Sequence, residues 1–324
     1  MLVKRSSVME KRIEKKSEKT EGKINFEELL ETAVKLPLVC INREDFLRRE
    51  LQKYCDDDVV TEAIEHNPAY AGIPSRTISR IADSCIKYET AKVSTFSFAA
   101  GIPGGLAMIG TLPADFIQYY AHVLRIMQKL SYLYGWNELI GEDGAMDDET
   151  NHLLILFTGV MFGVNGAVAA VNKLSAQIAS RVVKTLPQKA LTKGLIYPIV
   201  KKVATILGVK MTKDVFAKGV AKVIPIVGGV VSGGITFASY MPMSKKFKKY
   251  LAGLKPADVK YYKNIKEGKE KDYYEVEFTE SEAETINERL QQELDEIEEE
   301  KDVKQNLNEE KVVAENLDEF KAEE

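Results

Sequence analysis

Three long windows without an acidic or basic side chain most constrain what this chain can fold into. They cover Val93–Ala114, Thr150–Asn172 (with His152 taken as neutral) and Val223–Ser244. Each is about as long as the roughly 20 apolar residues that cross a bilayer as a helix. Residues 153–171 form the best candidate for a single span. The windows are also compatible with surface-attached or re-entrant hairpins and with the core of a soluble bundle.

The rest of the body has apolar side chains at helical spacing and no convincing two-residue alternation typical of a strand. Helices are expected over about 26–34, 42–54, 59–66 and 75–88. The sequence therefore predicts an all-α fold, a multi-helix bundle with glycine-rich apolar helical hairpins.

The first window contains several helix-breaking residues. Pro103-Gly104-Gly105 marks a tight connection. Pro113 fits the first turn of a following helix, where its missing N–H would have no partner anyway. That helix is expected over about 112–134 and ends at Tyr134-Gly135, where glycine supplies the left-handed position after a helix. The breakers thus delimit two apolar elements packed as a hairpin.

The expected helix at 112–134 carries a narrow polar stripe on an otherwise apolar surface. The stripe consists of Asp115, Gln118, His122, Arg125 and Lys129, spaced by three and four residues. A helix that is apolar around most of its circumference is largely buried. The stripe is therefore either a thin solvent-facing seam or an internal network in which Asp115 and Arg125 neutralise each other, directly or through a partner.

Charge divides the chain into three parts. Residues 1–23 are almost continuously charged and lack the apolar segment of a signal peptide, so we expect a disordered N-terminus. Residues 24–255 are expected to form the helical domain. Residues 256–324 form an acidic tail, because 272–324 hold 21 acidic against 5 basic side chains. Such a segment is expected to be disordered or an exposed helix.

The last part of the body is strongly basic. Residues 173–255 carry 16 Lys and Arg and a single acidic side chain. Lys245, Lys246, Lys248 and Lys249 directly follow the third window and are expected to touch anionic headgroups at a membrane surface. Membrane lipid is therefore the expected partner. Nucleic acid is not, because the lysines form no recognition motif and the acidic tail would compete for them in an autoinhibitory contact.

Three cysteines, Cys40, Cys55 and Cys85, show no CxxC spacing. They indicate free thiols in a reducing compartment. The expected location is the cytoplasm or the cytoplasmic face of the membrane. The sequence does not indicate an oligomeric state.

Motifs that carry chemistry are sparse. Glu149-x-x-His152 has the spacing of a di-iron helix, but such a centre needs two of these motifs and two further glutamates. Glu149 is better explained as one of the acidic residues at the start of a helix than as a metal ligand. Asp115, His122 and Arg125 are the remaining catalytic candidates, although Asp115 and His122 lie about 10 Å apart along a helix. We expect no metal and no cofactor, and a non-enzymatic protein rather than an enzyme.

Several ordered blocks of the chain resemble the EcsC protein family. The blocks are FLRREL (46–51), the region 68–92, IPGGLAMIGTLPADFIQYYAHVLRIMQKLSYLYGW (102–136), VMFGVNGAVAAVNKLSAQIA (160–179) and the segment 186–243. The motif positions that match are Pro103, Gly104, Gly105, Pro113, Asp115, Arg125, Tyr134, Gly135, Pro225, Gly228, Gly229 and Gly233. Gly159-xxx-Gly163 and Gly229-xxx-Gly233 also form faces on which helices can approach closely. Packing is the expected role of all these positions.

The resemblance implies a helical bacterial protein that is cytoplasmic or membrane-associated. The family is named for a gene beside an ABC transporter linked to secretion, so a membrane protein such as an ABC transporter is a further expected partner. The expected function is that of a non-enzymatic, membrane-associated accessory protein linked to envelope, secretion or transporter function. The alternatives are a soluble helical hydrolase that uses Asp115, His122 and Arg125, and a pore-forming or envelope-defence protein.

Overall fold

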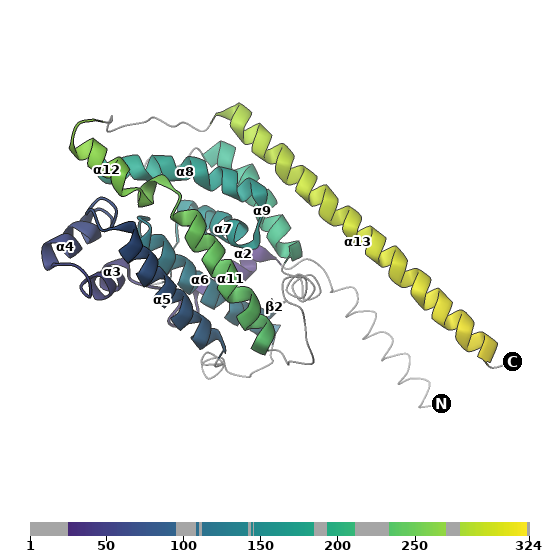
Figure 1. The fold of residues 1–324 in the computed structure, drawn as a ribbon. Coiled ribbons are helices and arrows are strands. Elements are labelled where there is room, and N and C mark those ends of the chain that lie inside the picture. Colours follow the sequence, from purple (N-terminus) through teal and green to yellow (C-terminus); the bar gives the residue numbers. More distant parts are fainter. Residues whose placement is uncertain are drawn as a thin grey trace.

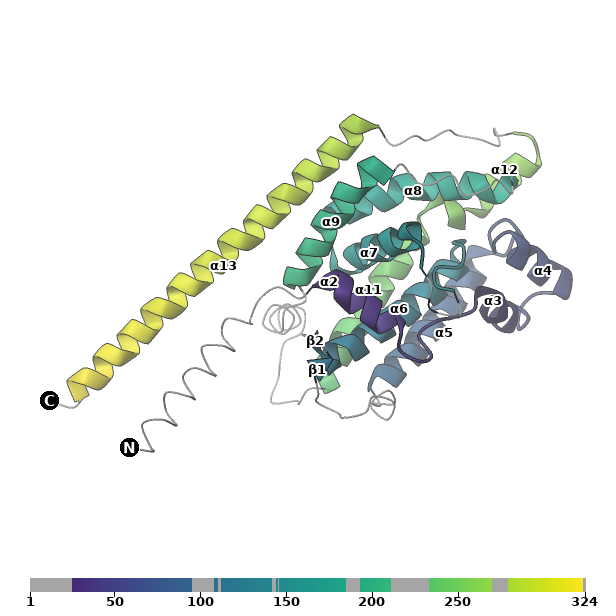
Figure 2. The ribbon, with the colours of Figure 1, turned by 180° about the vertical axis from the view of Figure 1, so that it is seen from behind.

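Helices form almost all of the architecture in the computed structural model of this chain (Figures 1 and 2). The structure describes residues 25–94, 108–109, 112–141, 144, 146–184, 193–210, 233–269 and 279–322. The helices are α2 (Phe26–Val34), α3 (Arg43–Leu51), α4 (Asp57–Glu65), α5 (Ser75–Ser94), α6 (Ala114–Leu133), α7 (Asp148–Phe162), α8 (Asn165–Lys184), α9 (Lys193–Lys210), α11 (Gly233–Leu251), the 3-10 turn η2 (Lys255–Ala257), α12 (Val259–Lys266) and α13 (Glu280–Ala322). Two-residue strands β1 (Met108–Ile109) and β2 (Leu112–Pro113) pair in antiparallel orientation. The prediction of an all-α multi-helix bundle is confirmed.

Helix α6 runs through the middle of the bundle and packs against α2, α3, α5 and α11. Every side chain from Tyr119 to Leu133 is buried. This burial follows from a surface that is apolar around most of the helix, since apolar area gains free energy when it leaves water. The helix begins at Ala114, so Pro113 lies just before its first turn and not inside it, in the short strand β2.

The second uncharged window forms two helices, α7 and α8, which meet at Gly163. Gly163 has φ +78°, a left-handed conformation that side chains rarely adopt. The amide of Val164 donates a hydrogen bond to the Gly159 carbonyl (2.8 Å), which closes the end of α7. The interpretation of 153–171 as one continuous span is therefore wrong, because the helix ends in the middle of that segment.

Gly159 lets three helices approach one another closely. A Cβ atom on Gly159 would lie 2.6 Å from Ala167 Cβ on α8 and 2.8 Å from Val203 Cγ1 on α9. Any side chain here would overlap its neighbours, so the α7–α8–α9 crossing requires glycine. The small-residue contact expected from the sequence is thus present at Gly159, whereas Gly163 ends a helix.

Within the ranges that the structure describes, none of the helices combines the length and the apolar character that a bilayer crossing requires. Residues 95–107 and 223–232, which belong to the first and third uncharged windows, lie outside those ranges. So do residues 1–23 and the motif positions Pro103, Gly104, Gly105, Pro225, Gly228 and Gly229. The interpretation of these segments as hairpins or bilayer elements stays a prediction.

The folded body continues beyond residue 255, where the sequence placed the start of the tail. Tyr261 and Tyr262 of α12 are buried. The Tyr262 hydroxyl accepts a hydrogen bond from the side-chain amide of Asn67 (2.9 Å), which ties α12 to the turn before α5. The predicted boundary is therefore wrong. A helix of eight residues is too short to show an apolar period clearly among its lysines.

The acidic tail forms one long helix, α13, whose first turns pack on α8 and α9. Among the side chains of α13 that the structure describes, Ala283, Ile286 and Leu290 are buried. Lys173 of α8 pairs with Glu282, and Lys210 of α9 pairs with Glu293 (2.7 Å). Figures 1 and 2 show α13 running past α9, with its C-terminal half extending away from the bundle. The tail thus contacts basic residues of α8 and α9.

Candidate functional site

A carboxylate with three basic neighbours lies inside the bundle between α5 and α6. Glu89 of α5 is 0% exposed. Arg125 donates two hydrogen bonds to it, from Nε to Oε2 (3.3 Å) and from Nη2 to Oε1 (3.2 Å). Lys129 Nζ donates to Oε1 (2.5 Å), and His122 Nδ1 lies 3.9 Å from Oε2. We call these four residues the Glu89 cluster.

The cluster keeps Glu89 ionised in spite of its burial. Burial alone raises the pKa of the Glu89 carboxyl, because a charge is poorly solvated away from water. The nearby His122 ring and the positive charges of Lys129 and Arg125 outweigh that effect and hold the pKa well below its usual range. One buried anion therefore faces two buried cations, Arg125 and Lys129.

Three residues of the polar stripe of α6 thus belong to an internal network, and for them the alternative of a solvent-facing seam is wrong. His122, Arg125 and Lys129 are all buried. The expected partner of Arg125 was Asp115, but the partner that the structure describes is Glu89, 36 residues away along the chain. The side chain of Asp115 lies outside the described part of the chain.

Sequence reasoning missed Glu89, although one signal could have found it. Ile78, Ala82, Cys85 and Ile86 form the buried face of α5, and Glu89 falls on the same face at helical spacing. A charged residue on an apolar face indicates a buried partner of opposite charge. The stripe of α6 offered that partner.

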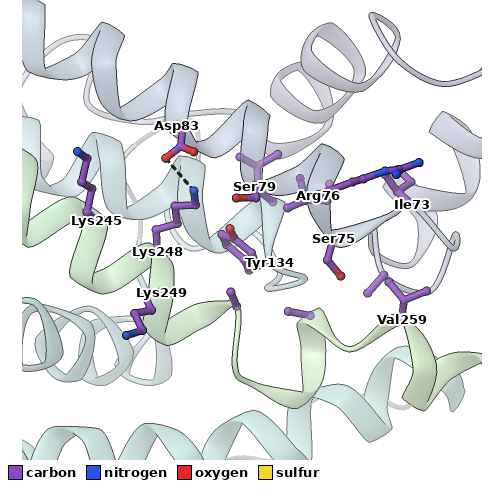
Figure 3. Close-up of a pocket in the computed structure, with 15 residues that line it drawn as sticks. Ile73, Ser75, Arg76, Ser79, Asp83, Tyr134, Lys245, Lys248, Lys249 and Val259 are labelled. Atoms are coloured by element: carbon purple, nitrogen blue, oxygen red, sulfur yellow. Dashed lines mark ion pairs between the residues drawn. The ribbon is translucent and has the colours of Figure 1, made fainter.

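A second candidate site is a groove of about 580 Å³ lined by the first half of α5, the C-terminal end of α6, α11 and the η2–α12 segment (Figure 3). We call it the basic groove. Part of its lining is apolar, from Ile73, Ile78, Leu133 and Val259. Clefts of a few hundred cubic ångströms with an apolar wall and a few polar groups are typical of ligand sites.

Positive charge dominates the basic groove. Arg76, Lys245 and Lys249 are exposed and form no ion pair with any residue that the structure describes. Lys248 pairs with Asp83 (2.7 Å), the single carboxylate in the lining. Four basic side chains against one carboxylate create a local potential that attracts anions.

Tyr134 contributes a buried hydroxyl to the lining. Its side chain is 4% exposed, and its hydroxyl reaches no hydrogen-bond partner among the described residues. In Figure 3 the hydroxyl points toward Ser79 and Lys248. Burial, assisted by the negative charge of Asp83, raises the pKa of Tyr134 above its usual range. The hydroxyl is therefore a neutral donor over the physiological pH range.

The turn after Tyr134 explains why this residue sits in the groove wall. Gly135 has φ +92°, and a Cβ atom on it would overlap the carbonyl oxygen of Pro256 in η2. The Trp136 amide donates to the Ser131 carbonyl (3.0 Å), which closes the end of α6. Tyr134-Gly135 thus ends α6 as predicted, and the glycine lets that end pack directly on η2.

Three of the four predicted membrane-surface lysines line the groove, namely Lys245, Lys248 and Lys249. Lys246 does not: its Nζ lies 3.0 Å from the point where a Cβ of Gly163 would sit, at the end of α7. Only three of the four line the groove because successive helical positions point in different directions. That all four lysines touch anionic headgroups at a membrane surface stays a prediction. Gly233, one of the motif positions of the family resemblance, is the first residue of α11.

Glu149 and His152 lie in the first turns of α7. Asp147 caps that helix by accepting a hydrogen bond from the Thr150 amide (2.8 Å). The His152 ring lies 6.0 Å from the ring of Tyr197 on α9, between ring centroids. In the part of the chain that the structure describes, no three His, Cys, Asp or Glu side chains are grouped so as to hold a metal ion.

The two candidate sites differ in what they can do. In the Glu89 cluster, Arg125 and Lys129 are both engaged with Glu89, and the His122 carbonyl accepts a hydrogen bond from the Tyr240 hydroxyl (2.9 Å) that ties α11 to α6. Such commitments suit a structural network. The basic groove presents exposed cations and is the better candidate for binding.

No family model, no curated protein and no solved structure matches this chain. The functional argument therefore depends on the geometry of the groove and of the cluster.

Proposed function

We propose that this chain is a non-enzymatic, membrane-associated helical protein that binds an anionic bilayer surface through the basic groove. The observation that carries the proposal is the set of exposed, unpaired cations Arg76, Lys245 and Lys249 at one groove. Basic side chains near an anionic membrane surface each contribute about 1 kcal/mol of binding free energy. Three such side chains around one groove give useful affinity only for a surface that offers many anions.

The resemblance of the sequence blocks to the EcsC family supports the same proposal. It favours the cytoplasmic face of a bacterial membrane, as do the three cysteines, which form no disulfide in the structure. The proposal includes an accessory role beside a membrane protein such as an ABC transporter, in envelope function or secretion.

Sedimentation of the full chain with vesicles tests the proposal. We expect binding to phosphatidylglycerol vesicles at low ionic strength, little binding to phosphatidylcholine vesicles, and a decline with added salt. The double variant Lys245→Gln/Lys249→Gln should lose about 2 kcal/mol, which is about 30-fold in the partition coefficient.

The matched control is Lys87→Gln/Lys201→Gln, which removes two exposed lysines outside the groove. It should change binding less than threefold. Wild-type protein that stays in the supernatant with phosphatidylglycerol vesicles, or a control that loses as much as the groove variant, would refute the proposal. Release of an entrapped dye from the same vesicles would instead favour the pore-forming alternative.

A further inference from the structure

We infer that the basic groove is a pocket for the headgroup phosphate of a single anionic phospholipid. The inference rests on the proposed function and goes beyond it, because a charged face binds any anionic surface, whereas a pocket selects one molecule. Three independent features of the groove support it: the positive end of a helix, a buried hydroxyl without a partner, and an apolar wall beside the charges.

The positive end is the first turn of α5. Helix α5 is 20 residues long, and the first amides of a helix have no partner within it. Ser75 and Arg76 occupy this turn, and Ser79 follows one turn later on the same face. Neither serine hydroxyl bonds to a residue that the structure describes. The amides of Thr77 and Ile78 donate to the Pro74 carbonyl, which leaves those of Ser75 and Arg76 without a partner among the described residues. Such amides, together with hydroxyls and a guanidinium at the positive end of a helix, are donors that bind a phosphate group.

The Tyr134 hydroxyl is the second feature, and it comes from a different element, the end of α6. A donor kept inside a fold without an acceptor destabilises that fold. Figure 3 shows the hydroxyl pointing to the same part of the groove as Ser79 and Lys248. A phosphoryl oxygen bound there, directly or through a water molecule, supplies the acceptor that the chain itself lacks among its described residues.

The apolar wall decides between a phospholipid and a free phosphate ester. Ile73, Leu133 and Val259 lie in the same lining as the cations. A free phosphate would leave this surface and most of the 580 Å³ volume to water. A phospholipid places its phosphate on the donors and its glycerol and first acyl carbons on the apolar side chains, so it satisfies both parts of the groove.

Calorimetric titration of the full chain with soluble ligands tests the inference. The probes are dihexanoylphosphatidylglycerol below its micelle concentration, dihexanoylphosphatidylcholine, and glycerol 3-phosphate, which has the phosphate without acyl chains. We expect the short-chain phosphatidylglycerol to bind at least tenfold more tightly than either of the others.

Two variants locate the site. Tyr134→Phe keeps the ring and removes only the unpaired hydroxyl, so it should weaken binding at least fivefold while the thermal midpoint is unchanged or rises. Arg76→Gln should weaken binding at least as much. The matched control is Arg80→Gln, one turn further along α5, exposed and outside the lining, with an expected effect below twofold.

The outcomes separate this inference from the proposed function. Unchanged affinity of both groove variants for short-chain phosphatidylglycerol overturns the pocket, even if vesicles still bind. Glycerol 3-phosphate that binds as tightly as the short-chain lipid overturns the phospholipid in favour of a free phosphate ester. Short-chain lipid that binds with the expected variant effects, without any vesicle sedimentation, supports the pocket and refutes the membrane-surface function.

Discussion

The Nζ atom of Lys129 lies 2.5 Å from Oε1 of Glu89, at a point where both side chains are buried. The contact joins α6 to α5 across 40 residues of sequence. The same carboxylate also binds Arg125. Charges taken out of water recover their solvation only through such partners, so each member of the cluster depends on the others. This dependence makes the cluster a sensitive probe of the bundle.

Glu89→Gln should lower the free energy of unfolding by about 3–5 kcal/mol, because it leaves Arg125 and Lys129 buried without a counter-charge. Urea unfolding followed by circular dichroism measures the change. Glu44→Gln is the control: Glu44 pairs with Arg48 at 2.7 Å on the exposed surface, and its loss should cost no more than about 1 kcal/mol. Adding Lys129→Met to Glu89→Gln should recover part of the loss. Equal effects of the buried and exposed glutamates would contradict the prediction.

The pH dependence of stability should carry the signature of Glu89. Its pKa in the folded protein lies below the usual value for glutamate, about 4.3, which applies to the unfolded chain. The unfolded chain therefore binds the proton more readily in acid, and the contribution of Glu89 is complete above about pH 5 and declines as the pH falls toward the folded pKa. Unfolding free energies measured from pH 7 down to pH 3 should decline less steeply in Glu89→Gln than in the wild type. Parallel curves would show that Glu89 does not contribute.

The sequence predicts the long central helix well because its signal is redundant. Apolar residues at 117, 120, 124 and 127 share the helical period, and Gly135 marks its end. The short helix α12 has no such redundancy, and the predicted body therefore ends too early. At Gly163 the sequence is ambiguous for another reason: glycine serves both close helix packing and helix termination, and only the fold decides which.

The candidate sites could be predicted only in part. The stripe of α6 indicates a polar network, but its partner Glu89 lies on another helix, and a single sequence does not pair residues across helices. The lysines of α11 are visible in the sequence as a cluster, whereas the groove forms only when Arg76, Tyr134 and Val259 are brought together from three other elements. Long-range packing, which local spacing does not encode, creates the site.

Gly159→Ala should lower the free energy of unfolding by about 1–3 kcal/mol, the usual cost of overpacking a core. The added Cβ would lie 2.6 Å from Ala167 Cβ and 2.8 Å from Val203 Cγ1, so α7, α8 and α9 would have to separate. Gly253→Ala is the control, since its Cβ would meet the Tyr250 carbonyl oxygen at an ordinary 3.5 Å. It should change stability by less than about 0.5 kcal/mol. An unchanged free energy of unfolding in Gly159→Ala would show that this helix crossing is looser than described.

Leu290→Ala should undock α13 from the bundle. Leu290 is fully buried, and it packs so closely on Gly166 of α8 that a Cβ on that glycine would overlap it. The expected loss is about 2–4 kcal/mol of contact free energy. Hydrogen exchange of the α13 amides should accelerate while exchange in α6 stays slow, because the docked helix opens separately from the core. Val303→Ala, at a position 58% exposed, is the control and should leave exchange unchanged.

Neutralising the tail contacts should strengthen membrane binding if α13 is autoinhibitory. Glu282 and Glu293 occupy Lys173 and Lys210, so Glu282→Gln/Glu293→Gln frees two cations on α8 and α9 while the apolar contact of α13 remains. Two freed cations near an anionic surface are worth up to about 2 kcal/mol of vesicle binding. Glu296→Gln/Glu299→Gln changes the net charge by the same amount on the exposed part of the same helix, so it controls for charge alone. An increase confined to the first variant supports release of the lysines. Equal increases in both variants would assign the effect to net charge, and no increase in either would rule out autoinhibition by this contact.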